Sequence, residues 1–274
     1  MLKQTLSSLL SKNELSELYS GFDIVGDIAI IKIPDSLQAK KKLIGQAILQ
    51  KLKPVKVVLM GGPVSGEYRI RELEHIAGEE RTSTIYKEHN CTFLVDVAKA
   101  YFSPRLSTER LRIAKLVKEG ERVLNMFAGV GIYSIIIAKV QPKCEVISIE
   151  INPDAREGGI ENIRVNKVGQ KVKSMLGDAR EVIKSGNIGK VDRVLMPLPE
   201  RASEFLEDAI SSLKPAGGWI HYYCHTYAEN KEGAISNSEK DVLGRLQGRG
   251  KINDIKVVRE VGPRWFQVVA DIKS

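Results

Sequence analysis

Two glycines on alternate positions, Gly129 and Gly131, mark a stretch of this sequence whose residue types suit ligand binding. An apolar run from Val123 leads into them and another starts at Ile132, so the pattern predicts a strand, a tight turn and a helix. Glycine there lets the backbone approach a flat or anionic ligand, and the helix start offers unpaired N–H groups. Glu150 ends the next apolar run, where a carboxylate can accept hydrogen bonds from ribose hydroxyls. We therefore expect a cofactor that contains a nucleoside.

The residues around the turn distinguish two classes of cofactor. A dinucleotide fingerprint requires a third small residue three positions after the second glycine, and Ser134 matches it only partly. The turn typical of methyltransferases begins with an acid or amide, and here Asn125 takes that position while Phe127 replaces the first glycine. Such turns also close many α/β units that bind nothing. The pattern favours S-adenosylmethionine, with Phe127, Gly129 and Gly131 beside it.

Further candidate cofactor contacts follow the next predicted strands. Asn152 and Pro153 begin a helix as N-cap and first helical residue, which places Ile151 between the strand and this helix. Asp178 follows the apolar stretch Val172–Leu176, where it can accept a hydrogen bond from an adenine amino group. We expect Glu150, Ile151 and Asp178 to contact the cofactor.

Strands alternate with helices from Val123 onward, which predicts a parallel sheet with helices on both faces. The final apolar stretches, Ile255–Val261 and Phe266–Ile272, predict a closing hairpin that adds an antiparallel strand, as in methyltransferases. We predict an α/β fold, a doubly wound, Rossmann-like class I methyltransferase sheet over residues 100–274. Gly158 and Gly159 conflict locally with the helix after Pro153, at a cost of about 2 kcal/mol.

The composition limits the class of protein. The chain has 274 residues and a formal net charge of +8, which favours a polyanionic partner. No apolar run is long enough to span a membrane, and the N-terminus resembles an amphipathic helix more than a signal peptide. Three cysteines far apart, Cys91, Cys144 and Cys224, indicate a reducing compartment. We expect a cytoplasmic protein that does not associate with membranes.

The first hundred residues predict a smaller α+β domain over residues 1–99, with helices at Leu2–Tyr19 and Leu37–Leu52 and a first strand near Asp23–Ile33. Basic residues gather in it: Lys40, Lys41, Lys42, Lys51, Lys53, Lys56, Arg69, Arg71 and Arg81. Each alone is typical of a solvated face, whereas the cluster suggests a surface for phosphate groups. The absence of a Pro/Gly/Ser-rich linker predicts a rigid junction near residue 100.

The junction carries a specific family pattern. Residues 66–79 read Gly-Glu-Tyr-Arg-Ile-Arg-Glu-Leu-Glu-His-Ile-Ala-Gly-Glu, and residues 101–106 read Tyr-Phe-Ser-Pro-Arg-Leu, followed by Glu109-Arg110. From about residue 60 to its end the chain resembles the archaeal and eukaryotic tRNA (guanine-37-N1)-methyltransferase family. The resemblance implies methyl transfer from S-adenosylmethionine to a guanosine beside the anticodon, with the N-terminal domain facing RNA and the anticodon arm as partner.

The resemblance also implies roles for individual residues. Glu109 matches the family's general base, which removes the proton from guanine N1. Arg69 matches the cation that stabilises charge on O6, with Arg71 as the fallback, and Tyr101 matches a cofactor contact. Without the resemblance, Glu109 is typical of an acid near a helix start and Arg69 of an exposed strand face. No histidine pair has zinc-motif spacing and a sulfonium needs no Lewis acid, so we expect no metal, and we expect a monomer.

One departure from the family leaves the substrate open. Pro197-Leu198-Pro199 stands where the family usually has Asn-Leu-Pro, and Pro197 offers neither a side-chain donor nor an N–H. We still expect Pro197 and Pro199 at the cofactor. The change suits the branch that methylates a tricyclic wyosine intermediate at the same nucleotide. Transfer of the aminocarboxypropyl arm to a wyosine precursor and a non-catalytic RNA-binding role remain alternatives, and a methyltransferase for small molecules or proteins is a third.

Overall fold

The computed structural model describes residues 3, 6–7, 9–19 and 21–274 of the chain. Its contacts divide the chain into two compact units, Met1–Arg105 and Leu106–Ser274. The division follows Arg105, a few residues after the boundary expected between residues 99 and 100. Within the N-terminal unit, Arg105 Nε donates to Asp23 at 2.6 Å, and the Phe102 and Tyr86 rings pack edge to face. These contacts tie the segment that includes Tyr101 to the N-terminal unit.

The N-terminal unit combines a four-stranded sheet, a hairpin and two α-helices within its described residues. In chain order the elements are α2 (Lys12–Glu17), β1 (Asp23–Val25), β2 (Ile28–Ile31), η1 (Asp35–Lys40), α3 (Lys41–Lys51), β3 (Val57–Ser65), β4 (Ile70–Gly78), β5 (Ser83–Glu88) and β6 (Cys91–Asp96), with the short η2 (Pro104–Leu106) at the division. The sheet order is β1-β2-β3-β4, with only the β2–β3 pair parallel, and β5–β6 form the hairpin.

The two helices expected here are shorter than the sequence indicated. Of the expected helix Leu2–Tyr19 the structure shows α2, which starts at a capping box between Ser11 and Glu14; residues 2, 4, 5 and 8 of that stretch lie outside the described residues. The second expected helix divides into the 3₁₀ turn η1 and then α3. The apolar face of α3 packs with β2, β3 and β4 in the core of this unit.

The expected strand Asp23–Ile33 is instead the hairpin β1–β2. Gly26 turns the chain with a φ of 57°, a conformation that glycine adopts at little cost. An added Cβ at Gly26 would lie 2.2 Å from Thr84 Oγ1, so β5 also packs too closely here for a larger residue. The prediction of one strand was wrong because the apolar pattern continues across this turn.

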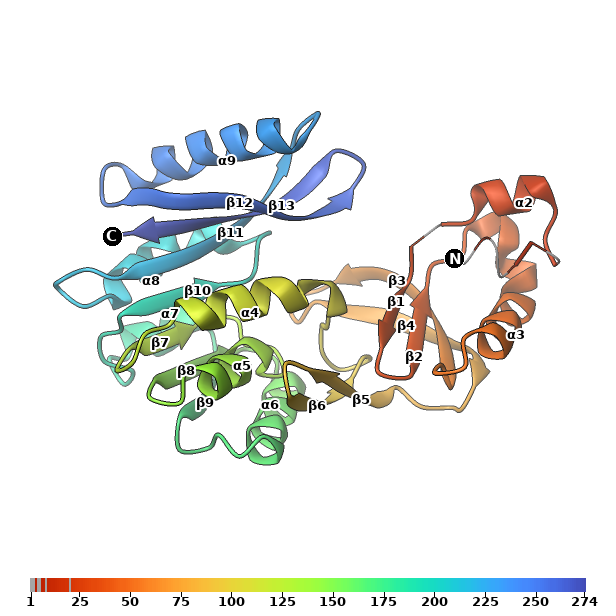
Figure 1. Ribbon diagram of the computed structural model, residues 1–274, viewed down its shortest axis with the longest axis horizontal. Helices are drawn as coiled ribbons and strands as arrows, with labels where there is room; N and C mark the ends of the chain where they lie inside the picture. Colours follow the sequence, from red (N-terminus) through yellow and green to blue (C-terminus); the bar gives the residue numbers. More distant parts are fainter. Residues whose placement is uncertain (1–2, 4–5, 8, 20) are drawn as a thin grey trace. The chain divides into compact units, whose positions relative to one another are not determined.

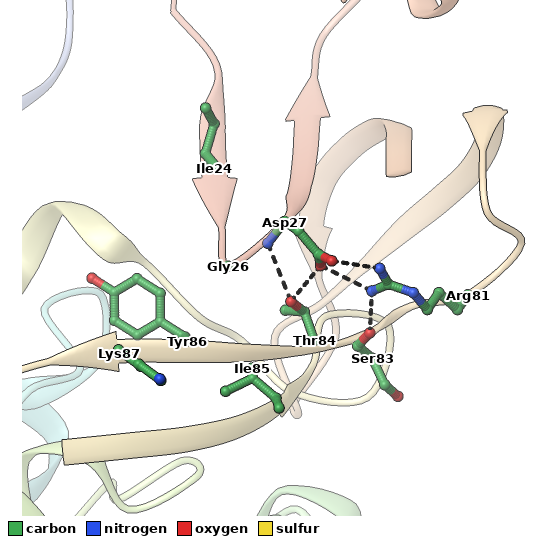
Figure 2. Close-up of a pocket in the computed structure, with 9 residues that line it drawn as sticks. All are labelled: Ile24, Gly26, Asp27, Arg81, Ser83, Thr84, Ile85, Tyr86 and Lys87. Atoms are coloured by element: carbon green, nitrogen blue, oxygen red, sulfur yellow. Dashed lines mark hydrogen bonds and ion pairs between the residues drawn. The ribbon is translucent and has the colours of Figure 1, made fainter. Parts of the chain in front are cut away.

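A hollow of about 630 Å³ lies beside this turn, between the β1–β2 hairpin and β5 (Figure 2). At its wall, Arg81 donates to both carboxylate oxygens of Asp27, at 3.0 and 2.6 Å, and Thr84 donates to Asp27 at 2.7 Å. Arg81 also pairs with Glu79 at 2.8 Å. These contacts hold the hairpin turn against β5, so Arg81 serves the fold of the unit and is not a free basic residue.

The C-terminal unit is a seven-stranded sheet between two layers of helices. Its elements are α4 (Ser107–Leu116), β7 (Arg122–Asn125), α5 (Ile132–Val140), β8 (Glu145–Glu150), α6 (Pro153–Val165), β9 (Val172–Leu176), α7 (Ala179–Lys184), β10 (Arg193–Met196), η3 (Ala202–Phe205), α8 (Leu206–Ser212), β11 (Trp219–Tyr227), α9 (Lys231–Leu246), β12 (Lys251–Gly262) and β13 (Trp265–Lys273).

The strand order β12-β13-β11-β10-β7-β8-β9 is that of a doubly wound sheet (Figure 1). The strands from β11 to β9 are parallel, and β13 and β12 join them as the antiparallel closing hairpin, which confirms the predicted fold class. Alternate residues of the central strands enter an apolar core with α7, α8 and α9, of which Figure 1 shows α9 lying along β12 and β13. Helices α4, α5 and α6 cover the opposite face.

None of the helices in the described part of the chain combines the length and the apolar character that crossing a membrane requires.

Candidate active site

The chain reverses its direction of winding between β10 and β7. From β7 the strands β8 and β9 are added on one side, whereas β10 and β11 lie on the other. The loops that follow β7 and β10 therefore diverge at the carboxyl edge of the sheet, which is where ligands bind in open α/β sheets. The turn with Gly129 and Gly131 follows β7, and Pro197 follows β10.

Buried polar side chains of β7, α5 and β8 form hydrogen bonds that stabilise the glycine turn. Gly129 and Gly131 have φ of 55° and 84°, which requires glycine or strain at each position. Asn125, fully buried, accepts from the Phe127 N–H at 3.4 Å and donates to Ser134 Oγ at 3.2 Å. Ser134 accepts a further bond from Ser148 at 2.6 Å, which ties β7, α5 and β8 together. Ser134, which matches the dinucleotide fingerprint only partly, and Asn125, at the first position of the methyltransferase turn, thus brace the turn.

Glu150 lies beside this turn at the end of β8. Its carboxylate accepts from the Gly129 N–H at 2.6 Å and from the Asn152 N–H at 2.9 Å. Burial raises the pKa of Glu150, and the backbone hydrogen bonds from Asn152, Gly129 and Ile151 only partly oppose it. The structure therefore brings Gly129, Glu150 and Ile151 together at the carboxyl end of β8.

The other expected cofactor residues lie along the same edge. Asp178 follows β9 and caps α7, where it accepts from the Arg180 N–H at 2.7 Å. Phe127 packs edge to face against Phe205, with ring centroids 4.9 Å apart. Pro197 and Pro199 are half-buried after β10. Carboxylates at two strand ends, the glycine turn and apolar side chains thus lie along one edge of the sheet.

Glu109, the expected base, lies in the first turn of α4 and is 7% exposed. Its Oε1 accepts from Arg112 Nη2 at 2.8 Å and from the Tyr223 hydroxyl at 2.7 Å, and its Oε2 accepts from Arg112 Nε at 2.7 Å. The Tyr133 hydroxyl donates to that of Tyr223 at 3.3 Å. Burial raises the pKa of both tyrosines, so they remain neutral donors at neutral pH. Glu109 is therefore more than an exposed helix-capping acid.

The arginine that holds Glu109 is shared with a second carboxylate. Arg112 donates to Asp271 at 2.6 and 3.1 Å, and Asp271 contacts His221 Nδ1 at 2.6 Å. His221 Nε2 lies 2.7 Å from Arg193 Nη1, and Arg193 pairs with Glu121 at 2.7 Å. A continuous chain of polar side chains thus links Glu109 in α4 to Glu121, the residue before β7, through side chains of β13, β11 and β10.

Arg69 lies in the turn between β3 and β4 and not on the strand itself. Its φ of 54° is in the left-handed region, which a residue other than glycine keeps only where the surroundings hold it. Its guanidinium stacks 4.6 Å from the centre of the Tyr101 ring. Arg71, the fallback, lines the same small hollow as Arg69 and Tyr101. These three residues belong to the N-terminal unit, and Glu109 belongs to the C-terminal unit.

The site predicted from the sequence lacked the side chains that surround Glu109 and link it to this polar chain, among them Arg112, Tyr223, His221 and Asp271. Arg112 could have been found, because it lies three residues after Glu109 on a predicted helix. His221 and Asp271 face each other only through the β11–β13 pairing, whose register is not readable from the sequence. Among the described residues, no group of three His, Cys, Asp or Glu side chains is placed to hold a metal ion.

Comparisons with known proteins decide the family. A model of the TRM5/TYW2 methyltransferase domain matches residues 84–242, and a model of the TYW2 N-terminal domain matches residues 2–82. The chain belongs to the TRM5/TYW2 family. Trm5b of Pyrococcus abyssi, named tRNA (guanine(37)-N(1))-methyltransferase, is 43% identical over 93% of this chain and 75% of its own. Taw21 of Saccharolobus solfataricus, named tRNA 4-demethylwyosine(37)-methyltransferase, is 35% identical over 94% of this chain and 95% of its own.

Solved structures of the family agree with this fold. The complex of aTrm5 and tRNALeu is 34% identical, with a TM-score of 0.86 over 99% of this chain and 77% of that one. TYW2 of Methanocaldococcus jannaschii, solved in complex with AdoMet, is 27% identical, with a TM-score of 0.67 over 92% of this chain and 98% of that one. The TRM5/TYW2 chain described here is a methyltransferase whose cofactor is S-adenosylmethionine.

Proposed function

We propose that this chain transfers a methyl group from S-adenosylmethionine to N1 of guanosine 37 in tRNA, beside the anticodon. The likeness to a relative named for that reaction, over 93% of the chain at 43% identity, carries the proposal. A relative solved with tRNALeu and the net charge of +8 support tRNA as the partner. We further propose that the enzyme is a cytoplasmic monomer whose N-terminal unit contacts the anticodon arm.

Glu109 is the base in this proposal. Guanine N1 carries a proton at neutral pH, so it is a poor nucleophile until a base removes that proton. Glu109 Oε2 accepts a single hydrogen bond from described residues, from Arg112, whereas Oε1 accepts two. The remaining lone pair of Oε2 is thus the acceptor for the N1 proton. Arg112 and Tyr223 fix the direction of this lone pair.

Arg69 stabilises the charge that develops on guanine O6 as the proton leaves. A cation aimed at O6 lowers the transition state more than the ground state. The stack on Tyr101 and the left-handed backbone hold the guanidinium in one orientation, which reduces the entropy lost when it meets the base. Tyr101 then positions Arg69, in addition to the cofactor contact that the family resemblance implies.

The residues at the carboxyl edge of the sheet hold the cofactor. Glu150 would accept from the ribose hydroxyls and Asp178 from the adenine amino group, with Gly129 and Gly131 leaving room for close approach. Phe127, Pro197 and Pro199 would form apolar walls that exclude water. When bound, S-adenosylmethionine supplies a methyl group that its sulfonium centre has already activated.

The proposal is tested by methyl incorporation from labelled cofactor into tRNA transcripts with guanosine or adenosine at position 37. We expect incorporation only with guanosine, and a loss of at least about a hundredfold in the Glu109→Gln variant. Glu119→Gln is the matched control, because this glutamate is 65% exposed and pairs only with Lys143 among described residues. Transfer to the adenosine transcript, or equal rates in wild type and Glu109→Gln, would overturn the proposed target or the proposed base.

A tricyclic wyosine intermediate at the same nucleotide is the second candidate substrate. The likeness to Taw21 over 95% of that relative and the match of residues 2–82 to the TYW2 N-terminal domain favour it. Pro197 favours it too, because a wall without a side-chain donor suits a larger and less polar base.

The second candidate is tested on tRNA that carries the tricyclic intermediate. We expect methylation by the native chain, and a shift of preference toward guanosine in Pro197→Asn. The mass of the product distinguishes a methyl group, on N1 or on C7 of the tricyclic base, from an aminocarboxypropyl arm. No turnover of the tricyclic tRNA would exclude this candidate.

A further inference from the structure

Arg112 bridges two carboxylates that come from opposite ends of the C-terminal unit's sequence. It binds Glu109 through Nε and Nη2, at 2.7 and 2.8 Å, and Asp271 through Nη1 and Nη2, at 2.6 and 3.1 Å. Glu109 and Asp271 are 7% and 4% exposed, so bulk water solvates neither carboxylate well. The single positive charge of Arg112 is thereby shared between two carboxylates.

The protonation state of His221 follows from its partners. Arginine has N–H donors and no acceptor, so the ring nitrogen facing Arg193 at 2.7 Å must accept and carries no proton. The other nitrogen, Nδ1, then carries the single ring proton and donates to Asp271 at 2.6 Å. Burial lowers the pKa of His221 and outweighs the opposing pull of Asp271, which agrees with a neutral ring. Asp271 is thus an ionised acceptor of three N–H groups.

Proton uptake by Glu109 changes the charge that Arg112 faces. Once Glu109 has taken the N1 proton, its carboxyl group is neutral, and a guanidinium paired only with it would be left as an uncompensated, half-buried cation. Asp271 removes that difficulty, because it remains ionised next to Arg112. Burial raises the pKa of Asp271, but the hydrogen bonds from His221 and Arg112 outweigh it and hold the pKa well below the usual range.

We propose that Asp271, paired with Arg112 and oriented by the neutral His221, is a positioning residue that keeps Arg112 paired while Glu109 takes up and releases the substrate proton. The inference rests on the proposed role of Glu109 as the base. Asp271 and His221 contact neither guanine nor cofactor in the proposed mechanism. Their role is to control, through Arg112, how strong a base Glu109 is. Arg112 orients Glu109, and Asp271 limits how strongly Arg112 weakens it.

Other groups around Glu109 do not replace Asp271 in this role. Tyr223 and Tyr133, from β11 and α5, are neutral hydroxyl groups. Arg110, the next residue of α4, is a cation near Tyr133 and so cannot supply the negative charge that Asp271 places beside Arg112. Arg193 and its partner Glu121 lie beyond His221 and reach the base only through it.

The Asp271→Asn variant is expected to alter how the rate depends on pH. Without the second anion, the whole charge of Arg112 acts on Glu109, so the Glu109 carboxylate of the variant is a weaker base than that of the wild type. We expect the plateau of single-turnover methyl transfer to fall by about three- to tenfold. The ratio of variant rate to wild-type rate should rise as the pH is lowered from 8 to 5. A merely structural role would lower the rate by the same factor at every pH.

The His221→Phe variant should shift the ratio in the opposite direction. This variant lacks the N–H that donates to Asp271 but keeps the negative charge of Asp271. More of that charge then acts on Arg112, so the positive charge of Arg112 acts less strongly on Glu109. The ratio of variant to wild-type rate is then expected to fall as the pH is lowered. This variant also keeps the inference testable where Asp271→Asn does not fold. His221→Asn, whose amide can still donate to Asp271, should restore the wild-type profile.

Glu121→Gln is the matched control, because it disturbs the far end of the same polar chain without touching Arg112. It is expected to lower the melting temperature and to leave the rate ratio independent of pH. Ratios independent of pH in both Asp271→Asn and His221→Phe, with cofactor and tRNA affinities unchanged, would overturn the inference and leave the proposed function intact. Absence of transfer by the wild type, or full activity of Glu109→Gln, would instead overturn the proposed function and this inference with it.

Discussion

The carboxyl group of Glu150 provides a test of cofactor binding that is independent of catalysis. Burial raises its pKa. In the proposed site, the ionised form would accept hydrogen bonds from the ribose hydroxyls. As the pH falls through this raised pKa, the carboxyl gains a proton and loses acceptor strength. We expect the affinity for S-adenosylmethionine to fall about tenfold below that pH, at a higher pH than for an ordinary glutamate.

Isothermal titration calorimetry between pH 4.5 and 8 measures this dependence. Glu150→Gln, which cannot titrate, should bind more weakly and with an affinity that does not change with pH. Circular dichroism at each pH verifies that the protein remains folded. Parallel pH dependence in the variant and the wild type would show that another group is responsible.

The two candidate arginines for O6 are distinguished by their surroundings. Arg69 is fixed by its stack on Tyr101 and by a left-handed backbone, whereas Arg71 is an ordinary residue of β4. We therefore expect Arg69→Ala to lower kcat by about a hundredfold and Arg71→Ala to lower it far less. Steady-state kinetics with saturating tRNA measure both. A larger loss in Arg71→Ala would move the role to that residue.

At the residue scale, the acids expected at the cofactor could be predicted from the sequence, whereas the side chains that hold Glu109 in place could not. Glu150 and Asp178 could be placed because an acid after a predicted strand lies at the ligand-binding edge whatever the tertiary detail. Glu109 required the family resemblance, since an acid in the first turn of a helix is common. Its partners Asp271 and His221 depend on which residues face each other across β11 and β13, and no local pattern encodes that register.

At the scale of elements, the C-terminal unit was predictable because its central strands are buried on both faces. Such strands read as short apolar runs between turn residues, and the runs from Val123 and at Phe266–Ile272 correspond to β7 and β13. In the N-terminal unit, the single strand expected at Asp23–Ile33 failed because Gly26 and Asp27 make a two-residue turn inside one apolar stretch. Gly26 was the available signal, and the continuing apolar pattern outweighed it.

The glycines of α6 and of the cofactor turn should respond oppositely to alanine. A Cβ at Gly158 would lie 3.5 Å from Val130 Cγ1, an ordinary contact, so Gly158→Ala should stabilise the fold by about 0.5–1 kcal/mol through helix propensity. Gly131 has a φ of 84°, and its Cβ would lie 3.3 Å from Ile135 Cδ1. Gly131→Ala should therefore destabilise the fold by about 1–2 kcal/mol.

Urea denaturation gives the free energy of unfolding for both glycine variants and the wild type. The pair is informative because each variant adds a single methyl group to the same region of the unit. Destabilisation by Gly158→Ala would mean that α6 packs against the turn too tightly for a methyl group. Stabilisation by Gly131→Ala would mean that the turn does not require its left-handed backbone.

At the scale of the whole molecule, the net charge is +8, and some of the basic side chains are paired with carboxylates whereas others are not. Two lysines of the cluster noted in the sequence are paired: Lys40 lies 2.5 Å from Glu14, and Lys41 lies 2.6 Å from Glu74. Arg81 is likewise paired with Asp27. The number of basic residues therefore overstates the positive charge available to a phosphate backbone. The structure distinguishes the basic residues that are paired with carboxylates from those that are not.

The unpaired lysines define the RNA surface to test. Lys51, Lys53 and Lys56 are exposed around the end of α3, and within the described residues none of them has a carboxylate partner. Each lysine that neutralises a phosphate releases a counterion, which steepens the dependence of affinity on salt. We expect Lys51→Ala/Lys53→Ala/Lys56→Ala to weaken tRNA binding and to reduce the slope of log K against log salt by about 2.

Fluorescence anisotropy of labelled tRNA between 50 and 300 mM salt, with about 0.7 of slope expected for each lost contact, measures this effect. Lys40→Ala/Lys41→Ala is the matched control: it also removes positive charge from the same unit, but the lysines it removes already neutralise Glu14 and Glu74. Its slope should stay close to that of the wild type. Equal slopes in the triple variant and the wild type would place the phosphate contacts on other cations. A larger change in the control would mean that tRNA displaces the two glutamates, so that these ion pairs open on binding.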